Sequence, residues 1–283
     1  MAFRVRAGAQ FFLVVLLTNL PLSAQDQPQL SPREQAWAVL HRGLEEIKAT
    51  KRLEAVKALS LVSGDRSAVR LALRALQDKD GRVRTAAAAS LGQLHATSAL
   101  PALKEALSDK DISVVLAATH SLFLLKDKSA YGVYYAILMR DKKSTGGMIQ
   151  GQLDRLKDPK QVAELGFQEG LGFVPFGGMG FEAYRTIMKR DSAPVRAAAA
   201  RFLTSDPDPV SGDALVQAAL ADKDQIVRQA ALDALAERGD PSCIERLLKN
   251  LSDDKEAVRY RTAATILRLS NAPKRTKRQQ PPK

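Results

Sequence analysis

DKDGRVRTAAAASL, at residues 78–91, is one copy of a pattern that recurs along this chain. The other copies are DKDISVVLAATHSL at 109–122, DSAPVRAAAARFL at 191–203, DKDQIVRQAALDAL at 222–235 and DDKEAVRYRTAATI at 253–266. Most of them begin about 31 residues after the copy before, and self-similarity at such a period is typical of stacked repeat units. The sequence therefore predicts a repeat protein.

Each copy has the apolar spacing of one helical face. Valine precedes the aligned position held by Arg84, a small residue such as Ala87 follows at three and Leu91 follows at seven. A second apolar helix precedes most copies and ends near Leu76, Leu107, Leu220 or Leu251. Neither helix of such a pair can bury its apolar face alone, so neighbouring pairs must stack. We expect an all-α fold, an α-solenoid of stacked antiparallel helix pairs with a pitch of about 31 residues.

These residues resemble the HEAT-like repeat family, including its short, lyase-type members, over about residues 33–270. The resemblance implies a ladder between adjacent repeats, built from an aspartate in each turn and an arginine at the start of each second helix. The matching pairs are Asp78 with Arg84, Asp222 with Arg228, and Asp253 with Arg259. Val115 replaces the arginine in the copy that begins at Asp109, so we expect the ladder to be broken there. The family indicates architecture far better than activity.

The N-terminal residues have the pattern of a targeting segment. Arg4 and Arg6 precede the apolar run FFLVVLL at 11–17, which predicts a signal peptide over 1–24, cleaved after about Ala24. The alternative is an uncleaved anchor or a buried first helix. We expect a secreted or periplasmic protein with no membrane span in the mature chain, and a polar linker at 25–31.

The C-terminal tail, PKRTKRQQPPK at 273–283, is basic and has no acidic or large apolar residue. Such a segment cannot offset the entropy of ordering, so we expect it to be disordered. It is either a solubilising extension or a site of weak contact with anionic lipid or polysaccharide of the envelope. Nucleic acid is the least expected of the anionic partners.

The repeat array should occupy residues 32–272. Ser31, Pro32 and Glu34 form the pattern of a capping box with proline at the first helical position, which predicts a helix over 32–47. A second helix is predicted over 52–62, and this atypical pair is suited to covering the end of the stack. A glycine- and phenylalanine-rich insertion at about 157–180 is either a packing element or a recognition loop.

Nothing in the sequence has the arrangement that catalysis or metal binding requires. His41, His95 and His120 fall in separate repeats, and no HExxH motif or HE pair is present. Cys243 starts an apolar helix and is expected to be a small buried residue. We expect no catalytic residue, no metal and no cofactor.

A binding surface is the remaining candidate. Positions one, five and nine after the aligned arginine are predicted to face away from the core. The resemblance to HEAT-like repeats implies that second helices line the concave side of the array. From this row and the insertion, the candidate partner-binding residues are Leu116, His120, Leu124, Arg201, Gln229, Asp233, Tyr260, Phe173 and Phe176. The sequence favours an exported, non-enzymatic scaffold that binds another protein. The alternatives are a lyase-like protein that handles a small molecule or cofactor through the insertion, and a polyanion-binding envelope protein that uses the tail.

Overall fold

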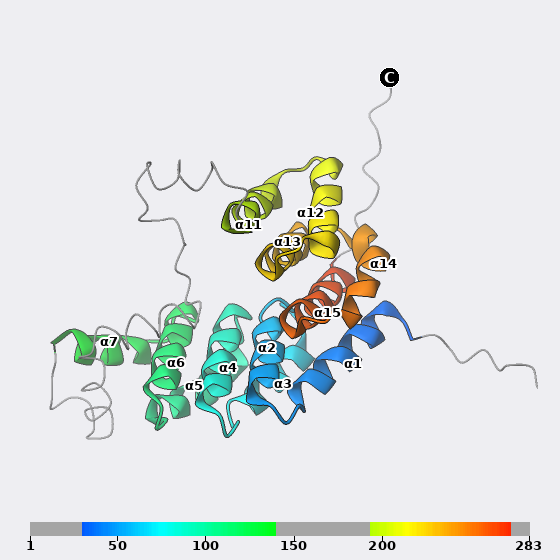
Figure 1. The fold of residues 1–283 in the computed structure, drawn as a ribbon. Coiled ribbons are helices and arrows are strands. Elements are labelled where there is room, and N and C mark those ends of the chain that lie inside the picture. Colours follow the sequence, from blue (N-terminus) through cyan, green and yellow to red (C-terminus); the bar gives the residue numbers. More distant parts are fainter. Residues whose placement is uncertain (1–29, 140–192, 273–283) are drawn as a thin grey trace, which may run out of the picture. The chain divides into compact units, whose positions relative to one another are not determined.

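The structure, a computed structural model, describes residues 30–139 and 193–272, and every element in these two stretches is a helix (Figure 1). The α-helices are α1 (Pro32–Leu44), α2 (Ala49–Leu59), α3 (Arg66–Ala75), α4 (Gly81–Gln93), α5 (Leu100–Glu105), α6 (Ile112–Leu124), α7 (Ser129–Met139), α11 (Ala193–Phe202), α12 (Pro209–Ala221), α13 (Gln225–Arg238), α14 (Ile244–Leu247) and α15 (Glu256–Ser270). Short 3-10 turns extend α5, α11 and α14. Each repeat consists of a first helix followed by a second helix. Among the described helices, the second helices are α2, α4, α6, α11, α13 and α15.

Local sequence signals set the helix starts. The Ser31 side chain accepts a hydrogen bond from the backbone of Glu34, and the Glu34 carboxylate accepts one from the backbone of Ser31. This is the predicted capping box, and it begins α1. Aspartates cap the second helices α4, α6 and α13, as Asp80 does by accepting from the backbone N–H of Arg82 at the start of α4.

The predicted apolar row forms the core. Four valines of the row, Val83, Val114, Val227 and Val258, are each 2% exposed or less, whereas Val195 on α11 is partly exposed. The small residues of the row are fully buried on α4, α6 and α13, where they are Ala87, Ala118 and Ala231, whereas Ala199 on α11 is exposed. Small side chains allow these helices to approach closely, while the leucines at the seventh position fill the space between layers. The predicted all-α solenoid is confirmed.

The helices do not stack in the order of the chain. α15, the last helix, packs against α1 and α2 as well as against α13. The second helices therefore follow one another in the order α11, α13, α15, α2, α4 and α6, and Figure 1 shows the red α15 beside the blue α1 and α2. We call the contact of α15 with α1 and α2 the junction. The prediction that the first pair covers an end of the stack is wrong, because both of its sides are occupied by other repeats.

Arginine–aspartate ion pairs form the rungs of a ladder that links four pairs of neighbouring repeats among the described residues. Arg84 donates from Nε and Nη2 to the two carboxylate oxygens of Asp109, at 2.8 Å each. Three further rungs join Arg52 to Asp78, Arg196 to Asp222 and Arg228 to Asp253. Hydrogen bonds from their arginines lower the pKa of Asp78 and of Asp222, which keeps both carboxylates charged.

The expected break at Asp109 is wrong, for a geometric reason. Each rung runs from an arginine to the aspartate of the following turn, so Asp109 depends on Arg84 and not on Val115. Val115 is 1% exposed and packs with Ile112 and Val133. Having no guanidinium, Val115 forms no rung of its own.

The predicted signal peptide, the insertion with Phe173 and Phe176, and the basic tail lie outside the described residues. Among the helices that are described, none has both the length and the apolar character needed to cross a membrane.

Candidate binding groove

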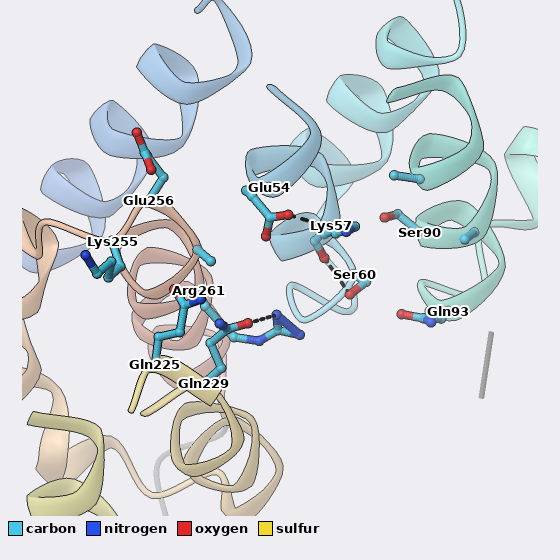
Figure 2. Close-up of a pocket in the computed structure, with 13 residues that line it drawn as sticks. Glu54, Lys57, Ser60, Ser90, Gln93, Gln225, Gln229, Lys255, Glu256 and Arg261 are labelled. Carbon is cyan, nitrogen blue, oxygen red and sulfur yellow. Dashed lines mark hydrogen bonds and ion pairs between the residues drawn. The ribbon is translucent and has the colours of Figure 1, made fainter. Parts of the chain in front are cut away.

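A groove of about 540 Å³ crosses four consecutive second helices. Its lining comes from α13, the start of α15, α2 and α4, so residues from both described stretches form its walls. Figure 2 shows one wall formed by Gln225, Gln229, Lys255, Glu256 and Arg261, the opposite wall by Ser90 and Gln93, and Glu54, Lys57 and Ser60 between them. The small residues Ala86, Ala89 and Ala257 complete the lining.

The charges of the groove are largely paired with one another. Arg261 donates from Nε to Asp233 at 2.6 Å and from Nη1 to the side-chain oxygen of Gln229 at 3.4 Å. Lys57 forms an ion pair with Glu54 at 3.3 Å, one turn earlier on α2. A site in which lysine and arginine are balanced by carboxylates attracts a polyanion only weakly. The amide groups of Gln93 and Gln225 can both donate and accept hydrogen bonds, which suits an uncharged polar ligand such as a peptide backbone.

The groove includes part of the predicted partner-binding set. Gln229 lines it and Asp233 lies one turn further along α13, paired with Arg261. Arg201 is exposed on α11, away from the groove lining. Phe173 and Phe176 cannot be placed, because they lie outside the described residues.

The predicted residues of α6 do not line the groove. Leu116, His120 and Leu124 are partly buried, so the expected pair of exposed leucines is not observed. Leu116 packs against Ile112, Val115 and Val133. The His120 ring stacks on Phe123, with the ring centroids 6.4 Å apart.

Tyr260 is not a surface residue. It is 3% exposed and lies against Gly43 of α1, where a Cβ on that glycine would be 2.5 Å from its ring. Thr85 and Ala197, at the same position of the predicted row, are also buried. The row was spaced by four residues, and each such step turns about 40° beyond a full helical turn, so its first member points toward the neighbouring helix. On α2 and α4 the groove follows positions two and five instead, as Ala86 and Ala89 do on α4, whereas Gln229 of α13 lines it from position one.

Residues of α2 were missed because the first pair was not aligned with the other repeats. Its turn lacks the aspartate-rich motif, but the helix itself carries the signal: Arg52, Ala55 and Leu59 have the spacing of Arg84, Ala87 and Leu91. That alignment places Lys57 at the fifth position, in the groove. It also identifies Arg52 as a member of the ladder.

The described residues offer no evident chemistry in or near the groove. Within residues 30–139 and 193–272, no three histidine, cysteine, aspartate or glutamate side chains come together as metal ligands would. Cys243 is 6% exposed, and burial raises the pKa of its thiol to about 11. The thiol is therefore protonated at neutral pH and is not a nucleophile.

The fold defines a helical-repeat protein, and sequence comparison identifies the family. A sequence model of HEAT repeats matches residues 39–122 and 181–268, which together make up more than half of the chain. The chain therefore belongs to the HEAT-repeat family. No curated protein matches it.

Several solved structures are similar to the chain over most of its length, at low identity. One chain in the structure of the complex of CpcE and CpcF of phycocyanin lyase from Nostoc sp. PCC7120 is 22% identical, with a TM-score of 0.32, and the match covers 88% of this chain and 98% of that chain. Human deoxyhypusine hydroxylase is 19% identical, with a TM-score of 0.34, over 85% of this chain and 86% of that one. Similarity at this level carries no argument about activity or partners.

Proposed function

We propose that this chain is an exported, non-enzymatic repeat scaffold that binds a segment of another protein in the groove. The observation that carries the proposal is the groove itself. It crosses four helices and is lined by polar side chains that take no part in packing the hydrophobic core. Stacked repeats commonly use such extended surfaces for binding. The paired charges favour a polypeptide over a polyanion.

Arginine at Gln93 and at Gln225 is expected to weaken binding in the groove. Both glutamines are exposed and lie on opposite walls, so the longer charged side chain should obstruct a ligand without disturbing the core. The probe is the strongest linear peptide recovered from a phage-displayed random library selected on the wild-type protein. We expect its dissociation constant, measured by fluorescence anisotropy, to rise about tenfold or more in Gln93→Arg and in Gln225→Arg.

Gln217→Arg is the matched control, because Gln217 is exposed on the first helix α12 and does not line the groove. Its dissociation constant should equal that of the wild type. If no peptide is recovered, or if all three variants bind it like the wild type, the groove is not the binding site.

Export is expected from residues 1–24, where two arginines precede an apolar run. Fused to alkaline phosphatase, which becomes active only after leaving a bacterial cytoplasm, these residues should give an active reporter. Replacing Leu13 and Leu16 within the run by lysine should abolish the activity, since an apolar run is what the export machinery recognises. An inactive fusion, or one insensitive to the lysines, would refute export.

A further inference from the structure

The junction brings together the first and the last of the described helices along the sequence. Arg33 donates from Nη1 to Asn271 at 2.5 Å and from Nη2 to Asp65 at 2.7 Å. Arg268 donates to the backbone carbonyl of Ser63 at 3.4 Å. Arg33 and Asn271, and likewise Arg268 and Ser63, are separated by more than two hundred positions in the sequence, so the junction is an interface that the chain makes with itself.

The junction lacks the ladder rung found between other repeats. Arg259 donates to the backbone of Asp253 in its own turn, and within the described residues it has no carboxylate partner across the junction. Glu46 occupies the position that Asp78 holds in the next repeat, but it pairs with Lys51 at 3.2 Å. Lys51 also reaches Glu256 across the junction at 3.6 Å. Partly exposed pairs of this kind contribute less than a buried bidentate rung.

The groove depends on the junction. Gln225, Gln229 and Arg261 belong to the C-terminal repeats, whereas Lys57 and Gln93 belong to the N-terminal repeats. Only the packing of α15 on α1 and α2 places these two groups of residues on one surface. If α15 left α2, neither half would retain the groove.

We propose that the groove is a conditional site, present only while the junction is closed, and that a ligand in the groove and the closed junction stabilise each other. A ligand that contacts both walls binds the closed form alone, so it must shift the chain toward that form. This inference rests on the proposed function, which assigns the groove as the binding site. The state of the junction, however, can be measured without any ligand.

A carbodiimide that couples lysine to a neighbouring carboxylate reports the state of the junction in the full chain. Lys51 can couple to Glu256 across the junction or to Glu46 within its own half, and mass spectrometry separates the two products. The ratio of the Lys51–Glu256 product to the Lys51–Glu46 product, which we call the cross-link ratio, measures the fraction of chains with a closed junction. The Lys51–Glu46 product is the internal standard. Gly43→Ala should lower this ratio, because the added Cβ lies 2.5 Å from the Tyr260 ring.

Gly92→Ala is the matched control. Its Cβ would lie 2.5 Å from the Ser121 hydroxyl, in the contact between α4 and α6 and away from the junction. The cross-link ratio should be unchanged in this variant. A second junction variant, Arg33→Ala with Asn271→Ala, removes hydrogen bonds without overpacking and tests the inference if Gly43→Ala does not fold.

The ligand arm uses the peptide selected on the wild-type protein. If a junction variant lowers the closed fraction to about one tenth, the apparent dissociation constant should rise about tenfold, although no groove residue has been changed. The peptide should also raise the cross-link ratio of the junction variant. An unchanged ratio in both junction variants, or an equal fall in Gly92→Ala, would overturn the inference whatever the peptide does. A lowered ratio with unaltered peptide affinity would overturn the linkage and leave the groove as an unconditional site.

Discussion

Arg84→Ala is expected to lower the free energy of unfolding by about 3 kcal/mol, as is typical when one partner of a buried ion pair is removed. The side chains of Arg84 and Asp109 are 8% and 15% exposed, and the variant leaves the Asp109 carboxylate without its bidentate donor. The variant also removes the hydrogen bonds that Arg84 donates to the backbone carbonyls of Asp78 and Lys79. Urea unfolding followed by circular dichroism measures the loss.

Arg82→Ala is the control for this prediction. Arg82 lies two residues away on the same helix, but its side chain is 55% exposed and pairs locally with Asp80. We expect a loss of less than about 1 kcal/mol, as for other exposed ion pairs. Equal losses in the two variants would mean that the ladder contributes no more to stability than an ordinary surface charge.

Ala231→Leu is expected to lower the free energy of unfolding by about 2 to 3 kcal/mol, because the site has no room for a larger side chain. Ala231 is fully buried on α13, where that helix meets α11 and α15. Differential scanning calorimetry should show a lower melting temperature. The fold of the remaining repeats should persist, since repeat stability is carried by interfaces between neighbours.

Ala199→Leu is the matched control, since Ala199 has the same repeat position on α11 but is exposed. Its effect should stay within about 0.5 kcal/mol, as for most surface substitutions. A melting temperature for Ala231→Leu equal to that of the wild type would show that the assigned packing of α13 is wrong.

The repeat architecture could be predicted from the sequence because it depends on local periodicity. Val83, Ala87 and Leu91 lie on one helical face whatever the neighbouring repeat is, and their burial follows from that. The stacking order could not be predicted in the same way. Many second helices carry a similar apolar face, so the apolar pattern alone does not determine which helices pack together. The packing of α15 on α1 and α2 depends on complementary shape, as where the Tyr260 ring lies against Gly43.

The binding surface was only partly predictable, for a related reason. Gln229 and Asp233 were identified from helical position alone, and they do lie at the groove. Lys57 was not predicted, because the turn before α2 lacks the aspartate-rich motif by which the other repeats were aligned. The groove itself required two distant segments of the chain to meet, and no spacing within either segment contains that information.

The junction also bears on how the protein is made. Chains are synthesised from the N-terminus at about 5 to 20 residues per second, so α15 leaves the ribosome roughly 10 to 40 seconds after α1 and α2. During that interval the nascent chain carries an apolar surface whose partner does not yet exist. The earliest repeat is thus the one that stays unprotected longest, and a holding chaperone would be needed most before the final helix is complete.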